Sequence, residues 1–294
     1  MTSAFSRSWD LTKITFSVIG KDKEMLLFPI LAGAFSLLFI AAQLVPTLLV
    51  VVVGGLGLDR LGALQWGLLF IVYFGLAFIA TFFNVCVVYT AKTRFEGKNA
   101  AFMDSIRFAF SRIHLIFTWS LVSATVGLLL RIIDRLAQRS GPIGRMVFSI
   151  ISGILGIAWS IATLFVIPAM VYKGLGPIDA LKVSVNTFKK TWGESIIRYI
   201  GFGFAQLMFF AIGIILAIPI FLLSLSAGVI GIVAAIFIII VYFVFVAMLF
   251  GVATAVFNTA LYTYAATGKI PHGYSKEILQ NSFKRKDAKM KGIV

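Results

Sequence analysis

Few polar side chains interrupt the long apolar runs of this sequence, and these few are the first candidates for chemistry. Asn84, Gln206 and Asn258 lie inside such runs. Amide side chains at membrane depth can line a polar pathway for a solute. They can equally form hydrogen bonds between helices and hold a bundle together, which is their commoner role. From the sequence, both interpretations stay open.

Charged side chains are missing from the interior of the apolar runs. All 11 acidic and 26 basic residues fall in loops or at the ends of the runs, which argues against a proton pump, a cation-coupled carrier and a voltage sensor. His114 has no second ligand at a suitable spacing, and Cys86 is the only cysteine, so we expect no metal site and no intrachain disulfide. No nucleophile elbow, phosphate loop or pair of carboxylates appears. The sequence therefore predicts a protein that is not an enzyme and that has no catalytic residues and no cofactor.

The composition defines the class of protein. Hydrophobic residues make up 60% of the 294 residues and charged residues 13%, whereas an average soluble domain has about 25% charged residues. The mean hydropathy of +1.02 predicts an integral membrane protein. The net charge of +15 comes from cations in short segments between apolar runs. Cations placed beside a bilayer attract anionic head groups, at about 1 kcal/mol each, so we expect membrane lipids rather than nucleic acid as partners.

Runs without charged residues predict six transmembrane helices, because one crossing needs about 20 apolar residues. They are expected at about 26–53, 63–91, 113–131, 146–172, 198–223 and 229–265. The last charge-free run, from Arg198 to Lys269, is about three times too long for one crossing, so we expect a hairpin at "SLSAGVIG" (224–231). The first run is too long for a signal peptide. Residues 1–268 are expected to form one membrane domain, and 269–294 a basic tail.

The distribution of Lys and Arg predicts the orientation. Twenty-one of them fall in the N-terminal segment, the 92–112 loop, the 173–198 loop and the tail, and five fall in the loops between. Cytoplasmic loops carry the excess of Lys and Arg. We therefore expect a multi-pass protein of the plasma or inner membrane with both termini in the cytoplasm.

An amphipathic segment precedes each predicted pair of transmembrane helices. In residues 102–113 and 178–188 apolar residues recur at steps of three and four, with charges on the opposite face, which is typical of a helix lying in the membrane interface. The fold class is therefore all-α, with three parallel helical hairpins, each preceded by a cytoplasmic interfacial helix. The residues expected to contact lipid or a partner there are Arg107, Arg112, Trp119, Lys182, Lys189, Lys190 and Trp192.

Two further features concern the shape of the bundle and its opposite face. Pro168 is expected to kink the fourth transmembrane helix near its cytoplasmic end. The outward loop "RIIDRLAQRSGPIGR" carries Arg131 and Arg135 one helical turn apart, beside Asp134. These two arginines could bind an anionic ligand or lipid head group, although such residues are more often a solvated helix end.

Most of the chain resembles a known family. The stretch "SATVGLLLRIIDRLAQRSGPIGRMVFSIISGILGIAWSIATLFVIPAMVYKGLGPIDALKVSVNTFKKTWGES" and the segment "FFNVCVVYTAKTRFEGKN" resemble an uncharacterised family of prokaryotic six-span membrane proteins, catalogued as a domain of unknown function. The stretch "VIPAMVYKGLGPIDALKVSVNTFKKTW" is more distantly similar to the membrane domain of glycerophosphodiester phosphodiesterases, in which a separate soluble domain carries catalysis. The resemblance implies a fold and no activity.

Two functions follow as hypotheses. The first is a non-enzymatic membrane scaffold, assembly factor or lipid-interacting protein, which could form a homo-oligomer or bind another membrane protein. The second is a channel or transporter for a small or amphiphilic solute, with Asn84, Gln206 and Asn258 along its route. An intramembrane enzyme has the least support, because nucleophiles and bases are missing.

Overall fold

A computed structural model describes residues 13–20, 22–52, 62–192 and 200–274, and all regular structure among them is helical. Residues 13–20 are helical and lead into a short 3-10 helix, η1. The elements that follow have these bounds: η1 Lys23–Leu26, α2 Leu27–Val52, α3 Gly62–Phe95, α4 Phe102–Ser111, α5 Ile113–Arg139, α6 Pro142–Ala162, α7 Val166–Lys173, α8 Pro177–Trp192, α9 Ile200–Ser224, η4 Leu225–Ala227 and α10 Gly228–Thr267.

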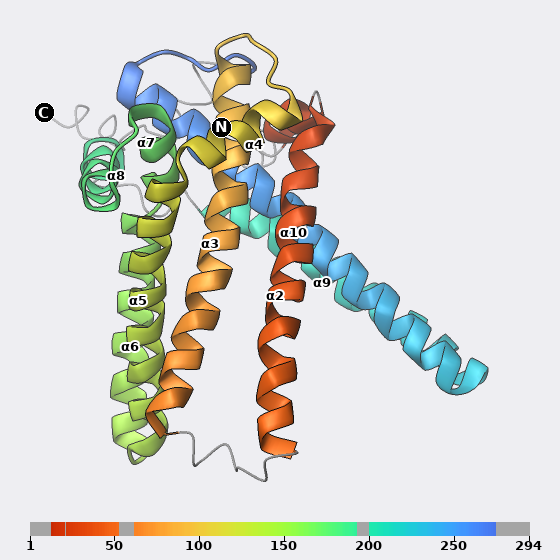
Figure 1. Cartoon of the computed structure of the whole chain (residues 1–294). Helices are drawn as coiled ribbons and strands as arrows, with labels where there is room; N and C mark the ends of the chain where they lie inside the picture. The colour runs from red at the N-terminus through yellow and green to blue at the C-terminus, as the bar shows by residue number, and fades with distance from the viewer. Residues whose placement is uncertain (1–12, 21, 53–61, 193–199, 275–294) are drawn as a thin grey trace, which may run out of the picture.

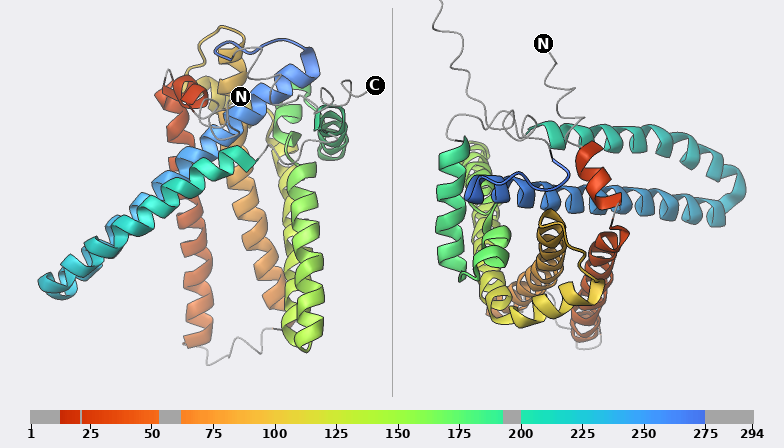
Figure 2. Two further views of the ribbon diagram at one scale, coloured as in Figure 1. Left: turned by 180° about the vertical axis from the view of Figure 1, so that it is seen from behind. Right: turned by 90° about the horizontal axis from the view of Figure 1, so that it is seen from above.

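The long helices form two groups. Helices α2, α3, α5 and α6 run roughly side by side, whereas α9 and α10 pack against each other and leave the others at a steep angle (Figures 1 and 2). The short helices α4, α7 and α8 gather at one end of the bundle. We call this end the platform. It comprises residues 13–20, residues 22–28 with η1, residues 82–95 of α3, α4, residues 112–120, residues 165–173 with α7, α8 and residues 250–274.

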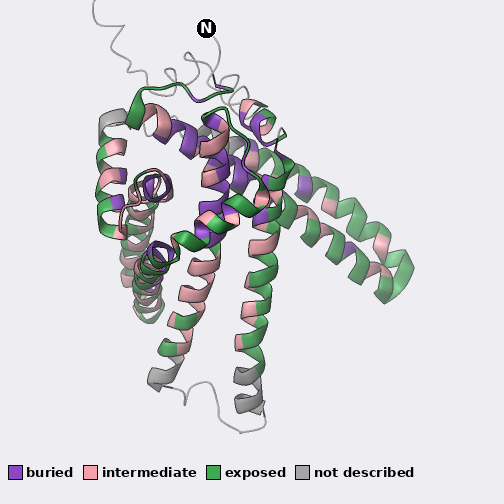
Figure 3. Ribbon diagram, turned by 45° about the horizontal axis from the view of Figure 1, so that its top comes forward, coloured by how far each residue is buried: buried purple, intermediate pink, exposed green. Residues whose placement is uncertain are grey.

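The buried core lies in the platform. Most buried residues cluster at this end of the molecule, whereas the far halves of the long helices are mostly exposed or half-buried, with a few buried residues such as Ala137 and Ala235 (Figure 3). The largest fully buried side chains are those of Met25, Phe28, Val85, Val88, Ile116, Phe165, Val166, Phe250, Val256, Leu261 and Tyr262. Away from the platform, apolar side chains such as Leu37 and Ile230 are 70% and 84% exposed. Lipid tails rather than water suit such a surface.

Five stretches of the described chain are long and apolar enough to cross a membrane: Lys23–Val45, Trp66–Phe95, Ile113–Arg139, Pro142–Lys173 and Ala205–Thr267. Six were predicted, and the difference lies in the last stretch, whose 63 residues contain α9, η4 and α10. The chain does turn near the predicted hairpin, since α9 ends at Ser224 and Gly228 adopts a φ of +66°. Tyr242 fastens α10 to α9, because its hydroxyl donates a hydrogen bond to the carbonyl oxygen of Phe209 at 2.9 Å.

One sequence prediction about an element end was wrong. The third transmembrane helix was expected to stop at 131, but α5 continues to Arg139 and leaves only a short turn before α6. Arginine is a good helix former, so the first charged residue did not end the helix.

The fourth helix is interrupted where the kink at Pro168 was predicted. Residues 163–165 form a turn, and α7 starts at Val166 with Pro168 in its first turn. A proline has no N–H for the carbonyl group four residues before it and clashes with that group, so the interruption falls in the turn before Pro168.

Candidate functional site: the platform

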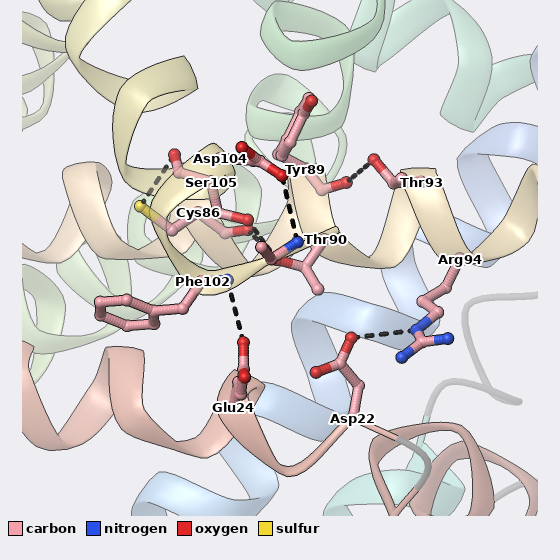
Figure 4. A network of polar contacts seen from close by, with 11 residues as sticks. Asp22, Glu24, Cys86, Tyr89, Thr90, Thr93, Arg94, Phe102, Asp104 and Ser105 are labelled. Carbon is pink, nitrogen blue, oxygen red and sulfur yellow. Dashed lines mark hydrogen bonds and ion pairs between the residues drawn. The ribbon is translucent and has the colours of Figure 1, made fainter. Parts of the chain in front are cut away.

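Within the platform, the N-terminus of helix α4 is attached to η1 (Figure 4). The backbone N–H of Phe102 donates a hydrogen bond to Oε2 of Glu24 at 2.9 Å, and that of Ala101 donates to Oδ2 of Asp104 at 3.3 Å. These N–H groups have no partner within the helix, and a carboxylate there also complements the helix dipole. Because Glu24 lies just before α2, this contact fixes α4 relative to the first long helix.

One face of α4 is buried against α3 through small polar side chains (Figure 4). The hydroxyls of Thr90 and Ser105 are 2.6 Å apart, and the Thr90 hydroxyl also donates to the carbonyl oxygen of Cys86 at 3.0 Å. The Cys86 thiol lies 3.5 Å from the carbonyl oxygen of Ser105 as a weak donor. Ser105 and Ala109 are both fully buried. Small residues on this face let the two helices approach closely, so α4 is packed on the bundle.

An ion pair joins the start of the chain to the end of α3. Nε of Arg94 donates to Oδ2 of Asp22 at 3.0 Å, and the Asp22 side chain is only 4% exposed. A buried carboxylate needs such a partner, because removing its charge from water is costly. The ion pair holds the residues before η1 against the last turn of α3.

Helix α8 is docked by the same means as α4. The break before α7 leaves the backbone N–H of Phe165 without a helical partner, and the hydroxyl of Ser184 accepts its hydrogen bond at 3.0 Å. Ser184 and Ala180, one turn apart on α8, are both fully buried. The opposite face carries the exposed ion pair of Lys182 and Asp179, 3.2 Å apart. The amphipathic helix thus turns its charged face outward.

The segment after α10 returns to the N-terminal stretch. The hydroxyls of Tyr274 and Thr15 are 3.0 Å apart, and the Tyr274 ring packs edge-on against Phe95. Burial raises the pKa of the Tyr274 hydroxyl well above its usual value, although the hydrogen bond with Thr15 lowers it. Because burial disfavours the ionised hydroxyl, the folded state keeps Tyr274 protonated, and stability falls as the pH rises above about 10, the ordinary tyrosine value.

Replacing Tyr274 with phenylalanine is therefore expected to flatten the loss of stability above about pH 10. At neutral pH the variant should lose only the hydrogen bond, about 1 kcal/mol. Melting temperatures of wild type and Tyr274→Phe in detergent, measured from neutral to alkaline pH, check this. Parallel alkaline curves for the two proteins would show that Tyr274 does not titrate as described.

The residues predicted to contact lipid or a partner divide into three groups. Arg107, Lys182 and Lys189 are exposed on the platform, and Arg112 is half-buried. For Trp119 the predicted interfacial contact is corrected, because its side chain is 5% exposed and stacks on Trp159 with ring centroids 5.8 Å apart. Its large ring is part of the buried core. The side chains of Lys190 and Trp192 lie outside the described residues.

The three intramembrane amides differ in exposure. Asn84 is exposed on α3 between buried neighbours, whereas Gln206 on α9 and Asn258 on α10 are half-buried. Asn258 has a partner of its own. The packing role and the polar pathway both stay predictions.

At the end opposite the platform, the two arginines of the predicted anion site are placed differently from each other. Arg131 is exposed. The Arg135 guanidinium lies 5.0 Å from the ring centre of Trp66, and Asp134 beside it accepts a hydrogen bond of 2.6 Å from Ser152. Arg135 therefore packs near the start of α3. Anion binding by Arg131 and Arg135 stays a prediction.

Sequence reasoning missed the residues that hold the platform together. Asp22, Glu24 and Arg94 were counted only as charges outside the membrane, and Ser184 was not singled out. Their partners lie as far as 78 residues away, and no local spacing signals such a pair.

Within the described ranges, no group of three His, Cys, Asp or Glu side chains could hold a metal ion.

Long apolar helices, a core confined to one end and exposed apolar side chains along the rest define an all-α, multi-pass membrane protein. A family of unknown function, DUF6159, matches residues 63–272. The chain belongs to this family. A comparison with curated proteins found no match, and nothing in these comparisons links the chain to glycerophosphodiester phosphodiesterases.

Proposed function

We propose that the chain is a non-enzymatic membrane scaffold or assembly factor whose platform engages anionic lipid head groups on the cytoplasmic side. The observation that carries this proposal is the docking of α4 and α8. Each helix has a face of small side chains buried against the core, and Arg107, Lys182 and Lys189 are exposed on the same end of the molecule. Two basic amphipathic helices held rigidly across the end of a helix bundle suit a surface that meets lipid head groups.

The proposed arrangement has six crossings, with α9 and α10 crossing as a pair and both termini in the cytoplasm. The excess of Lys and Arg at the platform end supports this orientation. The length of α10 supports a tilted crossing, because its 40 residues extend about 60 Å at 1.5 Å per residue, twice the thickness of a bilayer core.

Cysteine labelling in intact cells tests this topology. Ser111→Cys lies on the platform, and Gly141→Cys and Ser226→Cys lie in the two turns at the opposite end; all three positions are exposed. An impermeant maleimide is expected to label Gly141→Cys and Ser226→Cys but not Ser111→Cys. Cys86 is buried and gives the background. Labelling of Ser111→Cys, or of Ser226→Cys only after permeabilisation, would contradict the six-crossing arrangement.

Matched charge removal tests lipid engagement. The triple variant Arg107→Gln, Lys182→Gln, Lys189→Gln removes three exposed cations from the platform, and Arg131→Gln, Arg139→Gln, Arg145→Gln removes three exposed cations from the opposite end. In nanodiscs, exchanging phosphatidylcholine for phosphatidylglycerol is expected to raise the melting temperature of wild type and of the second variant. The platform variant should lose most of this rise, because each cation contributes about 1 kcal/mol. Equal behaviour of the two variants would contradict the proposal.

Transport of a small or amphiphilic solute is the alternative function, with Asn84, Gln206 and Asn258 along the route. Reconstituted protein that increases solute flux over empty liposomes, and loses this on Asn258→Leu, would favour transport over the scaffold.

A further inference from the structure

Two cations of the platform lie over aromatic rings and have no acidic partner within the described part of the chain. The Lys92 ammonium of α3 lies 4.8 Å from the ring centre of Tyr172, and the Arg112 guanidinium at the end of α4 lies 5.7 Å from that of Phe108. Both side chains are half-buried. Among the described residues, neither makes a hydrogen bond or an ion pair with a carboxylate. A half-buried guanidinium with unpaired N–H groups is poised to bind an anion.

Two chains of contacts connect Lys92 with Arg112. The first runs through α7: Tyr172 lies under Lys92, and an ideal Cβ on Gly174 would lie 2.9 Å from Nη1 of Arg112. The second runs through the aromatic pair of Tyr89 and Phe108, which stack with ring centroids 4.2 Å apart. Tyr89 precedes Lys92 by one turn of α3, and the Phe108 ring lies under the Arg112 guanidinium.

The surroundings fix the shape of this place. Gly174 has a φ of +63°, a conformation that favours glycine, and a side chain there would also displace Arg112. The Tyr172 hydroxyl is held 2.6 Å from that of Thr263 on α10, so the ring under Lys92 is positioned from both sides. Exposed Glu96, just beyond the end of α3, forms no ion pair with Lys92 in the described structure.

We propose that Lys92 and Arg112 form a binding site for a phosphate group at the junction of α3, α4 and the α7–α8 connection. Arginine offers two parallel donors to phosphate oxygens, and lysine adds a point charge. The phosphate belongs to a lipid head group or to a soluble phosphate compound, which share this chemistry. The inference deepens the proposed function and rests on it for the lipid source.

Binding measurements on the full chain test the site and its source. Native mass spectrometry with phosphatidylglycerol or phosphatidylcholine measures the lipid arm, and the melting temperature with inorganic phosphate or chloride at equal ionic strength measures the soluble arm. Lys92→Gln and Arg112→Gln are each expected to weaken phosphatidylglycerol binding about fivefold, with Lys98→Gln as an exposed control. A phosphate-dependent rise in melting temperature that these variants lose instead assigns a soluble phosphate. Unchanged binding in both arms overturns the site.

A measurement on wild type covers variants that fail to fold. Acetylation of Lys92 and phenylglyoxal modification of Arg112 should be slower in phosphatidylglycerol nanodiscs or with phosphate, while Lys98 reacts equally in all. Equal rates at Lys92 and Arg112 under all conditions overturn the site.

The failure of this site and of the proposed function are distinguishable. If only the Arg107, Lys182 and Lys189 variant loses its dependence on phosphatidylglycerol, the basic surface stands and the site is overturned. If only Lys92→Gln and Arg112→Gln lose binding, the site stands and the basic surface fails.

Discussion

Replacing Arg94 with alanine is expected to lower the free energy of unfolding of the platform by about 3 kcal/mol, because it leaves a buried carboxylate without its partner. Asp22 is 4% exposed, whereas Arg94 is 28% exposed, so the loss should lie near the lower end of the range for broken buried pairs. The melting temperature in detergent measures the effect. Since Asp22 precedes η1 and Arg94 ends α3, the variant should also loosen the start of the chain from the bundle.

Lys98→Ala is the matched control, because Lys98 is an exposed cation just beyond the end of α3. It should melt as wild type does. Asp22→Asn in the Arg94→Ala background should restore part of the stability, because it removes the uncompensated charge. An Arg94→Ala protein that melts with the Lys98→Ala control would mean that the Asp22 pair does not hold the platform.

Replacing Ala180 with leucine is expected to detach α8 from the core. Ala180 is fully buried one turn before Ser184, and extra methylene groups in a packed core cost about 1–3 kcal/mol. Detachment would also break the hydrogen bond from the Phe165 N–H to Ser184. Hydrogen exchange should therefore rise along α8 and at Phe165, while α3 and α10 keep their protection.

Asn186→Leu introduces the same side chain at an exposed position of α8 and serves as the control. Its exchange along α8 should match that of wild type. If Ala180→Leu leaves exchange along α8 unchanged, α8 is not packed through this face, and its rigid presentation of Lys182 and Lys189 is lost as an argument.

The sequence predicted most elements because their signals are local. Charge-free runs located the long helices, and steps of three and four located α4 and α8, since both patterns follow from the geometry of a single helix. The kink expected at Pro168 also rests on a local signal, because proline removes a backbone donor and clashes with the preceding turn. The helix is interrupted at residues 163–165. The sequence did not predict that Ser184 accepts the hydrogen bond of the freed Phe165 N–H.

Contacts between distant segments could not be predicted in this way. Trp119 follows a basic cluster and was assigned to the interface, but the position of Trp159 on α6 decides that it is buried. Asn84 lies in an apolar run, yet packing around α3 leaves it exposed. For Lys92 and Arg112, the sequence gives the charge, and the aromatic rings that hold them come from α7 and α4. A site built from several helices needs their packing, which no single run encodes.

The depth of α8 in a bilayer tests the central claim most directly. A spin label or fluorophore on Lys182→Cys, on the exposed face of α8, is compared with one on Ile154→Cys, on the exposed face of α6. Quenchers attached to lipid head groups are expected to act on the α8 label, and quenchers deep in the acyl chains on the α6 label. An α8 label that responds only to a water-soluble quencher would contradict a platform that engages lipid head groups.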